Sequence, residues 1–347
     1  MKRNLFVLSI LLVLIVSLFT INLKYVEAQV IDQGAPGGLI NNARDVNNAG
    51  QIVGWTSTDE GVKRAFLYNS ADDTMTDLGT LGGLYSFAMG INVHGQVIGY
   101  SNIDESIQRA FLYDGTTLTD LGTLGGHYSF AMGINNHGQI VGYSYNYDGY
   151  KRAFLYENGR MTDLGALGGN HSVALDINDN GQVVGYSNTE TGEVHAFLYE
   201  NNIMTDLGSI GGGNSMANAI NNQGKIIGWS SNIFNERQAF IYENGVMKNL
   251  GTLGGANSYA ADINESGKIV GHSEDVFGEI HAFVYENGKM TDLDTLGGSL
   301  SYAFSINDED QIVGRAMTSS GEQHAFSYDH GVMTDLEIFT GYYSTAF

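Results

Sequence analysis

The residues best suited to chemistry follow a glycine-rich corner, of the type TLGG, that recurs along the chain. Two freely varying positions come after each corner, and in the second to fourth copies they include Tyr85, His127, Tyr128 and His171. Tyr147 lies in a loop of the third copy. Aromatic faces beside hydroxyl and imidazole groups suit sugar rings, which present apolar C–H faces and hydroxyls. The pattern predicts a ligand site containing these five residues, and the alternative for each is an ordinary exposed loop residue.

Basic residues form a second cluster in the same part of the chain. Arg109 and Arg152, with Lys63, Arg64 and Lys151, stand where a variable loop enters the third strand of the first three copies. An arc of this kind would suit a carboxylated or sulfated glycan, because guanidinium groups bind such anions through paired hydrogen bonds. The alternative is local pairing with the acidic residues of the same loops. Those acids are Asp59, Glu60, Asp104, Glu105 and Asp148.

The sequence contains no nucleophile motif, paired-carboxylate signature or metal-ligand cluster. We therefore predict no cofactor and no metal, and a binding module for an extracellular glycan or surface ligand. One alternative is a polysaccharide lyase or hydrolase with His127, His171 or His195 as acid or base. Another is a cell-surface structural or adhesion protein, and fold alone does not decide between these classes.

A repeat of fixed length positions all of these residues. The leucine of a TDL-type sequence returns every 43 residues in seven copies. An Ala-Phe pair follows the same spacing, apart from a first step of 45 residues. Self-similarity at about this period is the signature of repeat folds. The leucines are Leu78, Leu121, Leu164, Leu207, Leu250, Leu293 and Leu336.

Each copy predicts four short strands. In the fourth copy they are SVALDIN, QVVGYS, HAFLY and MTDLG, and the second and third are rich in β-branched and aromatic residues. Gly181 closes a tight turn between the first two strands, where a positive φ suits glycine, and Asp310 takes this place in the seventh copy. Pairs such as Asn158-Gly159 join the third strand to the fourth. The nearly continuous apolar strands indicate sheets covered on both faces.

Such sheets predict an all-β fold, a seven-bladed β-propeller of four-stranded antiparallel blades with a 43-residue repeat. An open β-solenoid is the main alternative. Partial repeats at residues 31–38 and 344–347 would let the two chain ends complete one ring. Within a blade the tight turns share one rim, whereas the second connection and the corner share the other. Variable residues therefore gather on one rim, where binding sites usually lie.

Residues shared by the copies are interpreted as framework. The aspartate of TDL becomes Asn249 in the fifth copy, which keeps an oxygen acceptor and loses the charge. A hydrogen bond to turn backbone explains both residues better than a ring of metal ligands does. The asparagine of the IN sequence, such as Asn178, is interpreted in the same way.

The residue after the second-strand glycine is aromatic in most copies, which predicts packing between blades. It becomes His272 and Arg315 in the last two copies, which also contain His281 and His324, so a polar patch is the alternative. The aromatic residues are Trp55, Tyr100, Tyr143, Tyr186 and Trp229.

Residues 1–28 have the pattern of a secretory signal peptide. Lys2 and Arg3 precede an apolar run, and Val26-Glu27-Ala28 provides a cleavage site. The alternative is an uncleaved membrane anchor. Residues 29–347 contain no second apolar run and no linker, which predicts a single secreted propeller domain that has no membrane partner after signal cleavage.

Composition agrees with an extracellular repeat protein. The chain has no cysteine, 47 glycines and one proline, which fits tight turns without disulfide chemistry. Its formal net charge of −22 argues against nucleic acid and anionic membrane as partners. We expect a monomer.

The blocks INxxGQVVGYS, HAFLY and TDLGTLGG resemble the bacterial extracellular HAF repeat family, named for a His-Ala-Phe triplet. The resemblance covers about residues 31–347 and implies a secreted repeat protein. It carries over no catalytic residue. The sequence departs from the triplet, because the histidine position holds Arg64, Arg109, Arg152, His195, Gln238, His281 and His324.

Overall fold

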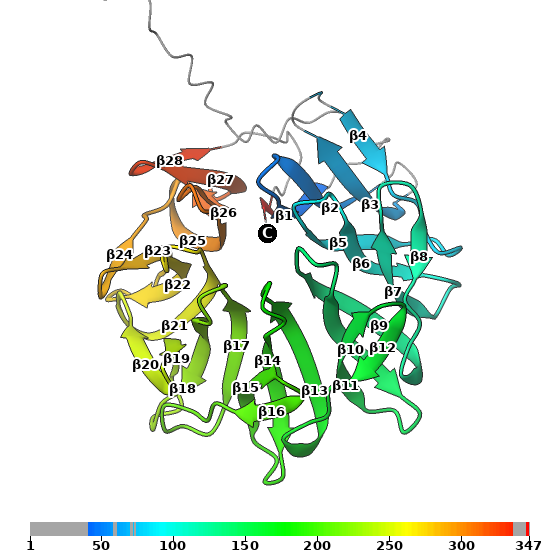
Figure 1. Cartoon of the computed structure of the whole chain (residues 1–347). Coiled ribbons are helices and arrows are strands. Elements are labelled where there is room, and N and C mark those ends of the chain that lie inside the picture. The colour runs from blue at the N-terminus through cyan, green and yellow to red at the C-terminus, as the bar shows by residue number, and fades with distance from the viewer. Residues whose placement is uncertain (1–40, 58–60, 70–71, 73, 336–344, 347) are drawn as a thin grey trace, which may run out of the picture.

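The computed structural model describes residues 41–57, 61–69, 72, 74–335 and 345–346, and its regular structure there is all β. The predicted signal peptide and the partial repeat at 31–38 lie outside the described residues. Successive strands form four-stranded antiparallel sheets arranged around a common centre (Figure 1). We number these sheets 1 to 7 in chain order; a parallel bridge between Ile280 and Leu300 joins sheets 6 and 7.

The first strand of each sheet lies nearest the centre, where it contacts first strands of neighbouring sheets. The second strand pairs beside it. The first strands are β1 Asn41–Val46, β5 Ser86–Ile91, β9 Gly125–Ile134, β13 Gly168–Ile177, β17 Ser215–Ile220, β21 Gly254–Ile263 and β25 Gly297–Ile306. The second strands are β2 Gln51–Ser57, β6 Val97–Asn102, β10 Ile140–Asn146, β14 Val183–Thr189, β18 Ile226–Ser231, β22 Ile269–Asp275 and β26 Ile312–Thr318.

The third and fourth strands continue each sheet outward, and the short fourth strand is its exposed edge. The third strands are β3 Lys63–Asn69, β7 Gln108–Tyr113, β11 Lys151–Glu157, β15 Val194–Glu200, β19 Arg237–Glu243, β23 Ile280–Glu286 and β27 Gln323–Asp329. The fourth strands are β4 Thr74–Asp77, β8 Leu118–Asp120, β12 Arg160–Asp163, β16 Ile203–Asp206, β20 Val246–Gly251, β24 Lys289–Asp292 and β28 Val332–Asp335.

The two kinds of tight turn are confirmed. Gly181 has φ 75°, and Asp310 adopts φ 67° at the corresponding place in sheet 7. Asn158 and Gly159 have φ 51° and 76°, a pair of positive values that a two-residue hairpin turn requires. Local turn chemistry therefore fixes the strand boundaries on this side of the ring.

The core lies between sheets. Phe197 of sheet 4 is fully buried in a cluster with Val141, Ala153 and Leu164 of sheet 3. Equivalent clusters join the other consecutive pairs of sheets. In sheets 2 to 6 each Ala-Phe pair thus serves two interfaces, because its alanine faces one neighbouring sheet and its phenylalanine the other. No single sheet can bury its own apolar faces.

The described C-terminal residues form β29, Thr345–Ala346, which pairs parallel with Asn42 and Ala43 of β1. β29 also contacts β26 and β27, so it lies between the first and last sheets. The partial repeat at 344–347 is predicted to help the two chain ends complete one ring. Its described residues, 345–346, join the sheet of β1 as a fifth strand, beside the last sheet.

Within the described ranges, no helix has the length and apolar character needed to cross a lipid bilayer.

Candidate functional site

The ring has two different faces. On one face, the tight turns after the first and third strands meet. On the other, here called the loop face, lie the connections between second and third strands together with the corners that lead to the next sheet. All seven predicted ligand residues lie in these connections or at the strand ends beside them.

Three aromatic side chains from sheet 3 meet on the loop face. The Tyr128 ring on β9 lies edge-on to Tyr145 on β10, with centroids 5.5 Å apart. His127 lies 6.4 Å from the same Tyr128 ring and is exposed. Tyr145 was not among the predicted ligand residues; its proximity to Tyr128 depends on the pairing of β9 with β10, which the spacing of the two residues does not reveal.

Tyr147 is the most exposed large side chain of this group, at 89%. Its ring lies on Gly125, where a Cβ atom would overlap several ring carbons. The sibling loops use the same place for other residues: Ile233 lies over Gly211 and Val276 over Gly254. In these three sheets the corner glycine contacts a side chain of the next loop, and in sheet 3 that side chain is an aromatic ring.

His171 joins the group from the corner before sheet 4. Its Nδ1 accepts a hydrogen bond from the Lys151 backbone N–H at 3.2 Å, and its ring lies 5.5 Å from Tyr150. Asn214 and Asn257 accept the corresponding backbone bonds in later sheets. Nδ1 of His171 therefore has a framework role, and Nε2 is the nitrogen left for a ligand. Tyr85 is 37% exposed at the corner before sheet 2, and no described ring contact joins it to Tyr128.

Three of the five basic residues, Lys63, Lys151 and Arg152, already have partners within their own sheets. Arg152 lies 3.2 Å from Asp163, a cross-strand neighbour, instead of pairing with Asp148 in its own loop. Lys63 stands over the Trp55 ring at 4.7 Å and Lys151 over the Tyr143 ring at 5.2 Å. Arg109 lies near Asp104, whose pKa is lowered mainly by the backbone N–H groups of Ser106 and Ile107 and to a smaller extent by the guanidinium.

The aromatic positions form a belt between sheets, as predicted. Trp55 of sheet 1 meets Phe87 of sheet 2 edge-on at 5.7 Å, and Tyr100 of sheet 2 meets Phe130 of sheet 3 edge-on at 4.9 Å. His272 continues this belt: it stacks on Tyr259 at 4.8 Å and meets Tyr302 edge-on at the same distance. Burial, with a smaller contribution from Arg315, lowers the pKa of His272 to about 4. His272 is therefore a packing residue that stays neutral at neutral pH.

In sheets 4, 6 and 7 the histidine of the His-Ala-Phe triplet contacts the TDL aspartate of the neighbouring fourth strand. His195 Nδ1 lies 2.8 Å from Asp206, and His281 and His324 contact Asp292 and Asp335 in the same way. Oδ1 of Asp206 also accepts the Gly208 N–H, and Oδ1 of Asn249 accepts that of Gly251, both at 2.7 Å. The predicted turn-capping role is confirmed.

Asparagines near the centre link the sheets in series. Asn178 Nδ2 donates to the backbone carbonyl of Asn221 at 3.0 Å, and Asn221 donates to that of Asn264. Asn178 Oδ1 also accepts the N–H groups of Asn180 and Gln182. The side chain therefore closes its own turn and binds the next sheet, which confirms its structural interpretation.

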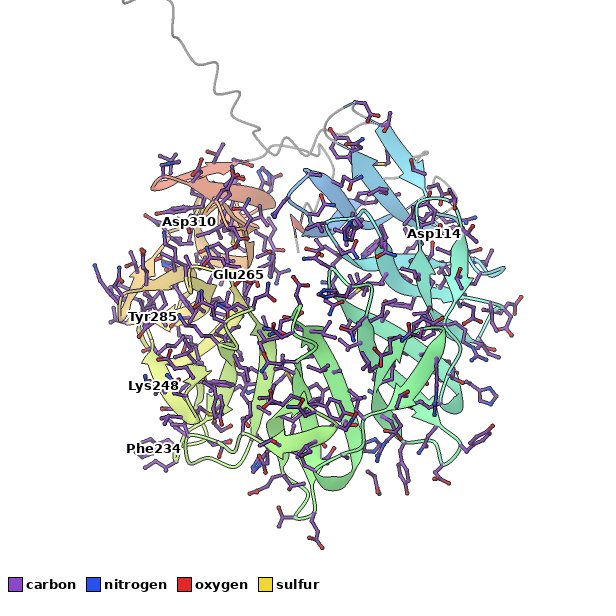
Figure 2. All side chains as sticks on the ribbon, viewed as in Figure 1. Asp114, Phe234, Lys248, Glu265, Tyr285 and Asp310 are labelled. Atoms are coloured by element: carbon purple, nitrogen blue, oxygen red, sulfur yellow. The ribbon has the colours of Figure 1, made fainter. Side chains whose placement is uncertain are left out.

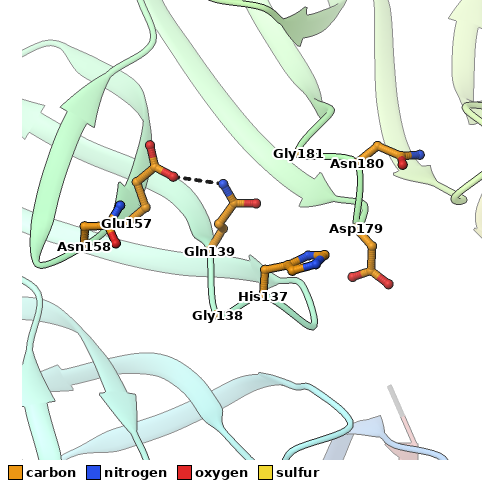
Figure 3. A pocket seen from close by; sticks show the side chains of 8 residues that line it. All are labelled: His137, Gly138, Gln139, Glu157, Asn158, Asp179, Asn180 and Gly181. Atoms are coloured by element: carbon orange, nitrogen blue, oxygen red, sulfur yellow. Dashed lines mark hydrogen bonds between the residues drawn. The ribbon is translucent and has the colours of Figure 1, made fainter.

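Two pockets open on the tight-turn face, where no ligand residue was predicted. One, about 400 Å³, lies between sheets 3 and 4 beside His137, Asp179 and the Gln139–Glu157 hydrogen bond of 2.9 Å (Figure 3). The other, about 240 Å³, is at the centre and includes Glu265, which lies near the middle of the ring in Figure 2. Both are polar and open. Gln182 makes the same bond to Glu200 in sheet 4, so the motif beside the first pocket recurs with the repeat.

No family model and no curated protein matches the chain. Solved structures resemble it at low identity. A puromycin-hydrolysing peptidase of Mycobacterium tuberculosis aligns with a TM-score of 0.59 and 13% identity over 86% of this chain and 52% of that one. An acylaminoacyl peptidase of Pyrococcus horikoshii gives 0.56 and 10% over 88% and 52%. The chain spans about half the length of both peptidases.

The β-propeller domain of the Trilobed protease from Pyrococcus furiosus, described as having an open velcro topology, is covered almost completely. It aligns with a TM-score of 0.59 and 9% identity over 88% of this chain and 98% of that domain. Identities this low show shared architecture alone. The chain is an all-β protein with the fold of a β-propeller.

Proposed function

We propose that this chain is a secreted glycan-binding module of the HAF-repeat type, with seven blades, a 43-residue repeat and a signal peptide at residues 1–28. The observation that carries the proposal is the tyrosine group of sheet 3. Tyr128 and Tyr145 contact each other beside Tyr147, which is 89% exposed on a glycine seat. Tyr128 and Tyr145 are half-buried on their strands, and Tyr147 lies in the loop that follows β10. Aromatic rings held in place by such contacts provide stacking surfaces at small entropic cost.

The proposed ligand is an uncharged glycan. Arg152 is paired with Asp163, and Lys63 and Lys151 lie over aromatic rings, so these cations already have partners. Imidazole and phenol groups at His127, His171 and Tyr128 supply hydrogen bonds to hydroxyls. An anionic glycan would also meet the repulsion of an acidic protein.

A glycan array of the protein beginning at Gln29 tests the proposal. Tyr147→Ala and Tyr128→Ala should each weaken binding by about fivefold, which corresponds to roughly 1 kcal/mol per stacked ring. Ile233→Ala is the matched control, because Ile233 occupies the same seat in another sheet. Binding that responds equally to Ile233→Ala and Tyr147→Ala would contradict the placement. Cleavage of a bound glycan in a product assay would favour the enzyme alternative instead.

A further inference from the structure

The hairpin between β22 and β23 brings three metal-ligating side chains together on the loop face of sheet 6. Ligand atoms of Asp275, Glu279 and His281 lie within 4.8 Å of one another. Two backbone hydrogen bonds close the hairpin: Asp275 N–H donates to the Glu279 carbonyl at 2.9 Å, and Gly278 N–H donates to the Asp275 carbonyl at 3.2 Å. Asp275 and Glu279 therefore face each other across the turn, and His281 follows two residues along the same strand face.

His281 is oriented by a second carboxylate. Its Nδ1 lies 2.8 Å from Asp292, while its Nε2 lies 3.9 Å from Glu279. The side chain is only 13% exposed, so the ring is held between the two acids. Hydrogen bonding at Nδ1 leaves the lone pair of a neutral imidazole on Nε2, on the side of Asp275 and Glu279. Metal-binding histidines are commonly fixed by an outer carboxylate in this way.

Two sibling sheets contain the same frame without the third ligand. His195 lies between Glu193 and Asp206, and His324 between Glu322 and Asp335. The hairpin bonds from Thr189 to Glu193 and from Thr318 to Glu322 match that of Asp275. Threonine thus stands where sheet 6 has aspartate. The histidine–aspartate contact is therefore common to all three sheets, whereas the aspartate at position 275 is found in sheet 6 alone among them.

The carboxylate of Asp275 is itself fixed. Its Oδ1 accepts the backbone N–H groups of Phe277 at 2.8 Å and Glu279 at 2.9 Å. Two carboxylates and one neutral imidazole carry a combined charge of −2, which a divalent cation would neutralise. A mixed nitrogen and oxygen donor set suits zinc and manganese better than calcium, which prefers oxygen donors alone.

We propose that Asp275, Glu279 and His281 bind one divalent transition-metal ion of the Zn²⁺ or Mn²⁺ class. The sequence conceals this site because D-x3-E-x-H is not a familiar metal motif. Only the hairpin pairing brings its first and last residues together, and Asp292 comes from a different strand. The comparison of sibling loops is the signal that marks it, since copies differ here by one ligand.

Titration of the EDTA-treated protein, beginning at Gln29, with Zn²⁺ and separately with Mn²⁺ in a calorimeter tests the proposal. We expect one saturable site for at least one ion. Asp275→Thr installs the siblings' residue on the same hairpin and should abolish it. Asp292→Asn should weaken binding by about 10–100-fold through loss of the outer carboxylate. Circular dichroism of each variant without metal shows whether the fold is kept.

Thr189→Asp provides the complementary test, because it adds the third ligand to the frame of Glu193 and His195. The stoichiometry should rise from one to two. Three outcomes would overturn the assignment. Neither ion shows saturable binding, or binding persists in both Asp275→Thr and His281→Gln, or the stoichiometry of Thr189→Asp stays at one.

Discussion

Asn249 donates a hydrogen bond from Nδ2 to Oε1 of Gln238 at 3.1 Å, in the place where sheet 4 joins Asp206 to His195. Two departures from the repeat thus compensate each other. Gln238 is buried, and its Nε2 donates to the Ala256 carbonyl, which fixes the direction of its amide. The carbonyl oxygen must therefore point at residue 249, and only a donor is compatible there.

Asn249→Asp should destabilise the protein by about 1–2 kcal/mol, because it places an acceptor against the Gln238 oxygen. The double variant Asn249→Asp with Gln238→His recreates the pair of the sibling sheets and should recover most of the loss. Urea denaturation of the wild type, both single variants and the double variant gives the coupling energy. Effects that add to within about 0.3 kcal/mol would show that the two sites are independent.

His272 should make the fold sensitive to mild acid. Its pKa in the folded protein is lowered to about 4 by burial, from an ordinary value near 6.5. The unfolded chain binds the extra proton first, so the stability linked to His272 is present above pH 6.5 and is lost as pH falls towards 4. At pH 5 the wild type should therefore have lost on the order of 1–2 kcal/mol of its free energy of unfolding. His272→Tyr introduces the tyrosine found at this position in sheets 2 to 4 and should not show this loss.

Thermal unfolding at pH 7.5 and pH 5 measures this difference. His94→Gln, at an exposed turn, is the control and should leave the pH dependence of the wild type unchanged. A pH dependence that is identical in wild type and His272→Tyr would contradict the prediction.

Asp176 should act in the opposite direction. It is half-buried on β13, and desolvation of its carboxyl raises the pKa to about 6, although backbone N–H groups of Ile220 and Ile177 oppose the shift. The folded state holds the proton more tightly, so this contribution to stability is present at pH 4 and is lost as pH rises through 6. Asp176→Asn removes the ionisation. Urea titrations give the free energy of unfolding of Asp176→Asn minus that of the wild type. This difference should be higher at pH 7.5 than at pH 4.5 by on the order of 2 kcal/mol. A difference of the reverse sign would exclude the burial argument.

Much of the architecture follows from local sequence. The turn at Gly181 and its variant at Asp310 depend on backbone conformation, which a few residues determine. The framework roles of Asn178 and the TDL aspartate were also predictable, because both positions recur along the repeat. The aspartate becomes an asparagine in the fifth copy, which indicates that its hydrogen bonds matter more than its charge.

Contacts between strands were harder to predict. Local pairing with a loop acid such as Asp148 is the alternative that the sequence offers for Arg152, but the register of β11 with β12 sets Phe154 opposite Asp163 and so brings Arg152 to Asp163. Tyr128 and Tyr145 meet through a bulged pairing of β9 with β10, and the parallel pairing of β29 with β1 has no local signal. These features depend on register, which the sequence period alone leaves open.

Gly125 should be as important to ligand binding as the ring that it seats. It has φ 109°, and a methyl group there would overlap ring carbons of Tyr147. Gly125→Ala should therefore displace the ring and weaken glycan binding by about fivefold, as expected for loss of a stacked aromatic side chain. Adding Tyr147→Ala to this variant should cause little further loss, because both changes remove the same contact.

Gly211→Ala is the matched control. Gly211 has φ 123° and seats Ile233, so alanine should cost similar stability there without touching the tyrosine group. Affinities from titration of the array's best glycan, read beside melting temperatures, separate the two effects. Equal losses of affinity in Gly125→Ala and Gly211→Ala would mean that general destabilisation, and not the position of Tyr147, controls binding.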